Sequence, residues 1–205
     1  MTLAAYQDAF ARMVLSPALC LRARTEGEAA FASFAMDAAE RARLLHIARQ
    51  PGMRITCILA RANRLSSLVG ALPLTCELLK PQIGLLVDRY WDTHPMADLQ
   101  SLPAGLAFAE YLAQEIEAGR VVARFAADVL RYERVWLELQ LSTHTGGLLP
   151  SDDAAVRELA FDFDPTTLFE ALSSGEPMPE VLPDKPTTAV LDFRSDPPQT
   201  RILET

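Results

Sequence analysis

The side chains best suited to nucleophilic or metal chemistry are three cysteines and three histidines, scattered along the sequence. They are Cys20, Cys57, Cys76, His46, His94 and His144. None of them shares a Cys-x-x-Cys, His-x-x-x-His or His-Glu-x-x-His spacing, which would bring two ligands to one metal ion. Cys57 and Cys76 stand among apolar residues, where a thiol usually packs as a small hydrophobic side chain. We therefore predict no metal site and no catalytic residue in this chain.

Two short groups of polar residues suggest acid–base chemistry. Asp162 and Asp164 are one residue apart, so a strand would project both carboxylates from the same side. Asp92 and His94 precede a proline and could form a carboxylate–imidazole pair. Ordinary structural roles explain both groups better, because Asp164 can cap a following helix and the segment around Asp92 has the composition of a helix end. The sequence also lacks a Gly-x-Ser-x-Gly nucleophile elbow and a glycine-rich phosphate loop.

Charge is distributed unevenly along the chain. Residues 1–64 contain nine arginines against five acidic residues, and residues 149–205 contain four basic against twelve acidic residues. The net charge of -8 argues against a general binder of phosphate backbones. The basic N-terminal region suits an acidic partner surface, although arginines on solvated helix faces would give the same pattern.

The elements that position these side chains change in type near residue 145. Before it, Ala, Leu and Arg dominate between prolines, which predicts a multi-helix bundle. Asp37 followed by Glu40 has the form of a capping box at a helix start. From Met53 to Leu72, apolar residues recur at steps of three and four, which predicts an amphipathic helix. That stripe consists of Ile55, Ile58, Leu59, Ala62, Leu65, Leu68 and Val69.

The sequence thus predicts a mainly α protein with a small C-terminal α+β segment. We expect a helical domain over residues 1–145, a linker over 146–154 and an α+β domain over 155–205. The elements expected in the tail are strands over 156–163, 188–193 and 200–203 and a helix over 166–172. A tail of about 50 residues is short for independent folding, so we expect it to pack on the helices or on a partner.

The sequence also predicts a soluble, cytoplasmic protein with no membrane partner. No apolar run approaches the roughly 18 residues that span a bilayer. The N-terminal residues lack the basic start and apolar stretch of a secretory signal. Three scattered cysteines are typical of reduced thiols in a cytoplasm and not of a disulfide framework.

Several motifs occur in an order typical of one protein family. Residues 61–72 read Arg-Ala-Asn-Arg-Leu-Ser-Ser-Leu-Val-Gly-Ala-Leu, and residues 90–95 read Tyr-Trp-Asp-Thr-His-Pro. Residues 126–133 follow as Ala-Ala-Asp-Val-Leu-Arg-Tyr-Glu. Over roughly residues 54–135, this series resembles the HvfC-like helical family.

This resemblance implies a function in partnership with another protein. Members of the family are usually encoded beside a TIM-barrel multinuclear non-haem iron oxidase, and the pair modifies cysteines of ribosomally made precursor peptides, as in thiaglutamate or methanobactin biosynthesis. The resemblance implies that the barrel holds the iron and that the helical chain, with no cofactor of its own, forms a heterodimer with it and helps recognise the leader peptide.

On this interpretation two sets of residues are candidates for binding. The partner interface would use Arg54, Arg61, Asn63 and Arg64. The peptide would add as a strand to an edge formed by Val190, Leu191, Asp192 and Phe193. Ordinary closure of the tail's own small sheet is the alternative role for that second set.

Two other classes of function stay open at this point. A DNA-binding regulator would place the N-terminal arginines on phosphates, although the acidic balance and the scarcity of Asn and Gln beside them weigh against nucleic acid. A free-standing enzyme would need a catalytic group that none of the motifs provides.

Overall fold

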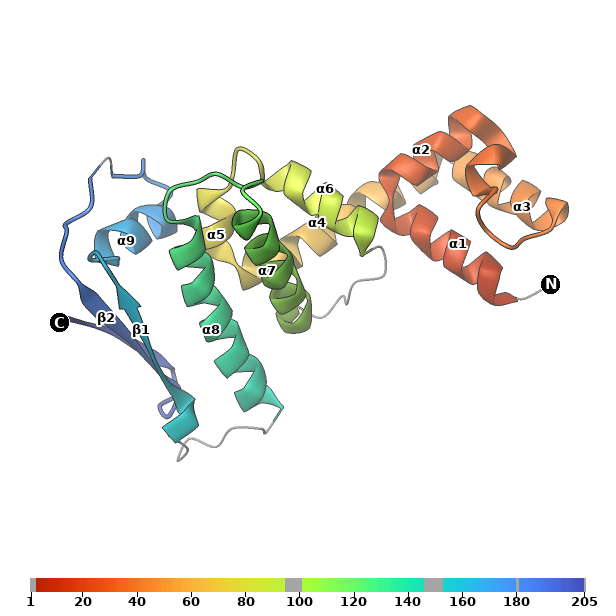
Figure 1. Ribbon diagram of the computed structural model, residues 1–205. Coiled ribbons are helices and arrows are strands. Elements are labelled where there is room, and N and C mark those ends of the chain that lie inside the picture. The colour runs from red at the N-terminus through yellow and green to blue at the C-terminus, as the bar shows by residue number, and fades with distance from the viewer. Residues whose placement is uncertain (1–2, 95–100, 146–152, 180, 205) are drawn as a thin grey trace. The chain divides into compact units, whose positions relative to one another are not determined.

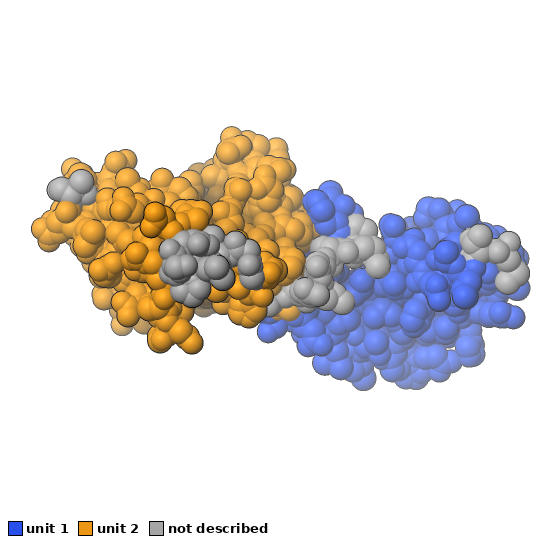
Figure 2. Space-filling view, turned by 90° about the horizontal axis from the view of Figure 1, so that it is seen from below, with its two compact units in different colours: residues 1–66, 91–97 blue, residues 67–90, 98–205 orange. Residues whose placement is uncertain are grey.

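The computed structural model describes residues 3–94, 101–145, 153–179 and 181–204. The chain forms two compact units, which Figure 2 shows in different colours. Unit 1 comprises residues 1–66 and 91–97, and unit 2 comprises residues 67–90 and 98–205. The division falls inside two helices, α4 (Pro51–Ala71) and α6 (Ile83–Thr93) (Figure 1).

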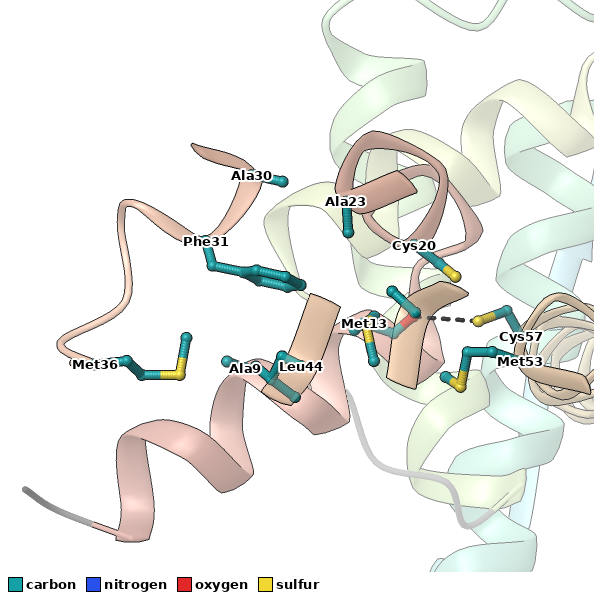
Figure 3. Close-up of a cluster of buried hydrophobic side chains, with 11 residues drawn as sticks. Ala9, Met13, Cys20, Ala23, Ala30, Phe31, Met36, Leu44, Met53 and Cys57 are labelled. Atoms are coloured by element: carbon teal, nitrogen blue, oxygen red, sulfur yellow. Dashed lines mark hydrogen bonds between the residues drawn. The ribbon is translucent and has the colours of Figure 1, made fainter. Parts of the chain in front are cut away.

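Unit 1 is built from helices around one apolar core. Its other helices are α1 (Leu3–Leu15), α2 (Pro17–Glu26) and α3 (Ala38–Arg49), with a 3-10 turn at Gly27–Phe31. The side chains of Met13, Phe31 and Leu44 are fully buried in this core (Figure 3). The predicted capping box opens α3, because the Asp37 carboxylate accepts the amide of Glu40 at 2.8 Å and Glu40 accepts the amide of Asp37 at 2.9 Å.

Helix α4 confirms the predicted helix after Pro51 but buries a different face from the one that its apolar pattern suggests. An amphipathic stripe normally faces the core. Here Ile55, Ile58 and Leu59 are 61%, 50% and 58% exposed. The buried positions in this part of the helix are instead Met53, Cys57 and Arg64. The apolar stripe therefore lies on the surface through the part of α4 that belongs to unit 1.

Unit 2 combines helices with a small antiparallel sheet. Its helices include α5 (Pro73–Leu78), α7 (Ser101–Glu117), α8 (Ala126–His144) and α9 (Thr166–Ser174). Its strands are β1 (Val156–Phe161), β2 (Thr187–Asp192) and β3 (Gln199–Glu204). The expected strands and helix of the tail are thus confirmed to within a few residues, as is the mainly α fold class with its small C-terminal α+β segment.

The sheet is ordered β1-β2-β3, and both pairings are antiparallel. One face packs on α8, where Leu139 shares a core with Ala189 and Leu191 of β2. The rings of Trp136 on α8 and Phe193 lie 4.7 Å apart between centroids. Helix α9 adds Leu168 and Leu172 to a second cluster with Val129 of α8. The tail therefore depends on α8 for much of its core.

This packing corrects the expected division after residue 145. The tail shares a compact unit with the helices from residue 67 onward, because its sheet buries an apolar face on α8. Within the expected linker over 146–154, residues 146–152 lie outside the described part of the chain, and a short 3-10 turn forms at Asp153–Ala155. None of the helices that the structure describes has the length and apolar character needed to cross a bilayer.

Candidate functional site

The strand proposed to receive a peptide is the central strand of the sheet. Residues 187–192 of β2 pair with β1 on one side and with β3 on the other. Val190, Leu191 and Phe193 are 6%, 0% and 5% exposed. The expectation that Val190, Leu191, Asp192 and Phe193 present an open edge is therefore wrong, because the hydrogen-bonding sides of β2 are already taken. Closure of the tail's own sheet, the alternative left open above, explains this strand.

The accessible edge belongs to β3. Every residue of this strand is exposed except Ile202, which is half-buried against the core. Within the described residues, β3 pairs with β2 alone, so its second side carries unpaired backbone groups. The edge at β1 is less open, since Arg131 of α8 donates to the Ala160 carbonyl at 2.6 Å. The Tyr132 hydroxyl on α8 lies 3.2 Å from that of Thr200 and ties β3 to the helix.

At one end of this sheet, the Asp192 carboxylate interacts with two arginines, Arg194 and Arg201. Its carboxylate accepts hydrogen bonds from the Arg194 backbone amide at 3.0 Å and guanidinium at 2.7 Å. The Arg201 guanidinium on β3 lies 3.7 Å away. The hydrogen bonds from Arg194 lower the pKa of Asp192 to about 2. The carboxylate is therefore ionised and fully engaged, and its role is to fix the turn after β2.

The four candidate interface residues on α4 do not form one surface. Arg54 and Asn63 are exposed, Arg61 is half-buried, and Arg64 is 6% exposed. The guanidinium carbons of Arg61 and Arg64 lie 5.2 Å and 4.4 Å from the ring centroid of Trp91. The structure thus brings the guanidinium groups of Arg61 and Arg64 together on one indole.

The stacked arginines have a structural role. A guanidinium over an indole face is attracted by the ring's quadrupole, and the attraction strengthens where water is excluded. Arg64 and Trp91 are both buried, at 6% and 9% exposure, so their contact forms part of the packing of unit 1. Arg64 is therefore not accessible to a partner, whereas Arg54 and Asn63 remain accessible.

The most strongly perturbed carboxyl group of unit 2 is one that sequence reasoning missed. The Glu133 side chain on α8 is buried and accepts the backbone amides of Leu74 at 2.7 Å and Thr75 at 2.8 Å, at the start of α5. Burial raises the pKa of Glu133 to about 7, although the amide hydrogen bonds oppose the shift. One available signal was an acid on the apolar face of a helix, four residues after Val129 and four before Leu137.

A pocket of about 390 Å³ opens beside Glu133 and is lined in part by Tyr132, Trp136 and Gln140 of α8. A carboxyl group that titrates near neutrality can accept or release a proton at physiological pH. Here both carboxylate oxygens are already bound to amides of α5, which defines Glu133 first as a support for that helix.

The cysteines are buried thiols. Burial raises the pKa of Cys57 to about 12, with the neighbouring Cys20 thiol adding to the shift, and it raises the pKa of Cys76 to about 12 as well. The Cys57 thiol donates to the Met13 carbonyl at 3.3 Å (Figure 3). A protonated, buried thiol is a poor nucleophile and a poor metal ligand. Both Cys57 and Cys76 therefore pack as small hydrophobic residues, as the sequence indicated.

The polar groups singled out in the sequence serve as helix ends. The Asp164 carboxylate accepts the amide of Thr166, the first residue of α9, at 2.9 Å, although the residue at the N-cap position is Pro165. Helix α6 ends at Thr93, and the His94 imidazole lies 2.8 Å from the Thr93 hydroxyl. Within the described ranges, no group of three or more His, Cys, Asp or Glu side chains is arranged to hold a metal ion.

Comparison with known proteins assigns no family to the chain. No protein-family model matches the sequence, and no curated protein matches it.

Proposed function

We propose that this chain is the partner subunit of a multinuclear non-haem iron oxidase of TIM-barrel fold, and that the pair modifies cysteine in a ribosomally synthesised precursor peptide. In this proposal the iron and the oxidation belong to the barrel. This chain binds the barrel and presents the peptide. The observation that carries the proposal is the exposed side of β3, which pairs with no further strand among the described residues, on a sheet that packs on α8. The order of motifs over roughly residues 54–135 supports it.

Strand addition at β3 explains how one subunit can hold an extended peptide. The main-chain groups of the edge supply hydrogen bonds to any sequence, and side chains on alternate positions supply selectivity. Ile202 faces the core, so by the alternation of a strand Arg201 and Leu203 project from the opposite face of the sheet. A peptide strand beside β3 would meet the side chains of Gln199, Arg201 and Leu203 on that face.

In this proposal the accessible residues of α4, Arg54 and Asn63, contact the oxidase. Unit 1 contains nine arginines and six acidic residues, whereas unit 2 contains ten basic and 21 acidic residues. Arg54, Arg61 and Asn63 are the exposed or half-buried members of the predicted interface. An acidic patch on the barrel would complement them.

Co-purification tests the partnership. The chain is co-expressed with a candidate TIM-barrel oxidase and examined by size-exclusion chromatography with metal analysis. We expect one complex, with iron present only when the barrel is present. Separate elution of the two proteins at micromolar concentrations would contradict the proposal, as would stoichiometric iron in this chain alone.

Backbone methylation of the precursor peptide tests the mode of recognition. In an added strand, alternate amides point toward the edge and the others point to solvent. Two peptides methylated on alternate sets of amides should therefore differ: one set abolishes binding to the chain and the other leaves it nearly unchanged. Equal binding of both peptides would exclude strand addition.

A further inference from the structure

Unit 1 displays apolar side chains on its surface at helical spacing. Ile55, Ile58 and Leu59 of α4 lie three and four residues apart and share one face of the helix. Each is at least half exposed, and Leu21 on α2 is 62% exposed. The same helix buries a charged residue, Arg64, on another side. A helix that exposes its apolar stripe while it buries an arginine has the surface expected of an interface.

A groove runs between α2 and α4 next to this stripe. Its volume is about 500 Å³, and Leu21 and Ile58 form part of its walls. Cys20 and Cys57 are also among its lining residues, and their thiols are neighbours (Figure 3). Both cysteines are buried, and the lining of the groove is mainly apolar. A groove of this size and character accepts the apolar side chains that an amphipathic helix presents at positions i, i+3 or i+4, and i+7.

Two arginines that line the groove favour a ligand with negative charge. Arg24 of α2 and Arg54 of α4 line the groove, and both are exposed. Neither forms an ion pair or a side-chain hydrogen bond with any residue that the structure describes. Other arginines of this unit do have partners, such as Arg12 with Asp8 at 2.9 Å. No carboxylate is among the described lining residues, so the groove favours a negatively charged ligand.

We propose that the groove between α2 and α4 binds an acidic amphipathic helix of a partner protein. Apolar side chains of that helix fill the groove and cover Ile55 and Leu59, and its carboxylates pair with Arg24 and Arg54. A second copy of this chain fits less well, because a two-fold interface would set the same arginine-bearing surface against itself. The inference concerns unit 1 alone and does not depend on the partner being an oxidase.

A synthetic peptide tests the groove without any other protein. The probe is a fluorescein-labelled helix of about 15 residues with leucines at i, i+3, i+4 and i+7 and glutamates on the flanks. The full chain is titrated into it at low salt, and binding is followed by fluorescence anisotropy. A second peptide carries lysine in place of each glutamate, and a third carries serine in place of each leucine. We expect the glutamate peptide to bind at least about tenfold more tightly than either control.

Matched variants locate the binding. Arg24→Glu should raise the Kd for the glutamate peptide by about tenfold, because it places like charges together. Arg43→Glu makes the same charge change at an exposed site on α3 outside the groove, and should change the Kd by less than about threefold. Ile58→Ser should weaken binding by about tenfold, and Val122→Ser, at a site 86% exposed in unit 2, should not change it. Circular dichroism checks that each variant is folded.

Three results would overturn the inference. The first is equal affinity for the glutamate and lysine peptides, and the second is tight binding that survives both Arg24→Glu and Ile58→Ser. The third is a dimer in sedimentation velocity that Ile58→Ser converts to monomer, since the groove would then be covered by a second copy. Restored binding of the lysine peptide to Arg24→Glu would support direct pairing at that residue. If the helical peptide does not bind the groove, the proposal that a precursor peptide adds to β3 is unaffected, because no residue of β3 lines the groove.

Discussion

The Glu133 carboxylate of α8 accepts the backbone amide of Thr75 at 2.8 Å, across 58 positions of sequence. Its other oxygen accepts the amide of Leu74 at 2.7 Å. The first turn of any helix has amides without partners in the helix itself. Helix α5 starts at Pro73 and has no side-chain cap of its own, so Glu133 supplies one from another helix. This contact joins α5 to α8, the helix that also carries the sheet.

Replacing Glu133 with Gln should destabilise the protein. The amide group of Gln can accept from one backbone amide, but its NH₂ then opposes the other, which leaves a buried donor unsatisfied. We expect Glu133→Gln to lower the free energy of unfolding by about 1–3 kcal/mol, measured by urea denaturation at about pH 5, where Glu133 is neutral in the folded chain and its hydroxyl oxygen, unlike an NH₂, can still accept. Glu138→Gln is the control on the same helix, because Glu138 pairs with Arg134 at an exposed site and should matter by less than about 0.5 kcal/mol. Equal effects of the two changes would contradict the capping role.

The free energy of unfolding should decrease as pH rises through neutrality, because Glu133 then loses its proton in the folded chain. Burial raises the pKa of Glu133 from 4.5 to about 7, so the folded chain binds this proton more tightly than the unfolded chain does. The contribution is therefore complete below about pH 4.5 and is lost as pH rises through about 7, by roughly 3 kcal/mol in total. Urea denaturation at about pH 5 and pH 8 measures it.

The neighbouring groups do not titrate in that window. Cys76 has a pKa of about 12, and burial raises the pKa of Tyr132 above 10. Asp192 and Asp164 have lowered pKa values and lose their contributions only in more acidic solution. Glu133→Gln should therefore flatten the dependence between about pH 5 and pH 8. If the free energy of unfolding of Glu133→Gln changes with pH as steeply as that of the unmodified protein, a group other than Glu133 causes the pH dependence.

Local signals explain why much of the fold was predictable. The capping box of Asp37 and Glu40 and the start of α5 at Pro73 depend on residues within one turn of each other. The tail's strands and the hydrogen bond of Asp164 to the first amide of α9 are also short-range patterns, and the structure contains them. Such signals establish that an element exists and where it begins, because they act within the element itself.

Long-range contacts explain what the sequence could not predict. Periodicity shows that Ile55, Ile58 and Leu59 share a face, but which face of a helix is covered depends on elements elsewhere in the chain. Arg64 is a charged residue in the sequence, and its burial, with Trp91 lying against its guanidinium, depends on contacts across 27 positions of the chain. Strand β2 is central because β3 pairs with its second side. No pattern within the sequence of β2 reveals that pairing.

Two of the three arginines of α4 should differ sharply in their effect on the free energy of unfolding. Arg64 is 6% exposed and its guanidinium lies 4.4 Å from the Trp91 ring, so Arg64→Ala removes a buried contact and leaves a void. We expect a loss of about 1–3 kcal/mol in urea denaturation. Arg54→Ala, at an exposed site on the same helix, should change stability by less than about 0.5 kcal/mol. Comparable losses would show that Arg64 is not part of the core of unit 1.

Two glycines of unit 2 should respond to alanine in opposite directions. A Cβ at Gly105 of α7 would lie 2.4 Å from the Cβ of Ala71 and 3.2 Å from a methyl of Leu137, closer than packed carbons allow. Because the Ala71 Cβ is fixed to the backbone, the helices must separate, and Gly105→Ala should destabilise the protein by about 1–3 kcal/mol. Gly70→Ala, in open space on α4, should stabilise it by about 0.5–1 kcal/mol through helix propensity.

The steric origin of the Gly105 effect can be separated from any other cause. If the clash with Ala71 is responsible, the double variant Gly105→Ala with Ala71→Gly should recover part of the lost stability, even though Ala71→Gly alone is unfavourable near the end of α4. A double-variant cycle by urea denaturation should therefore give a favourable coupling energy of about 1 kcal/mol or more. Additive losses would mean that Gly105 and Ala71 do not touch, and that α7 packs elsewhere on this unit.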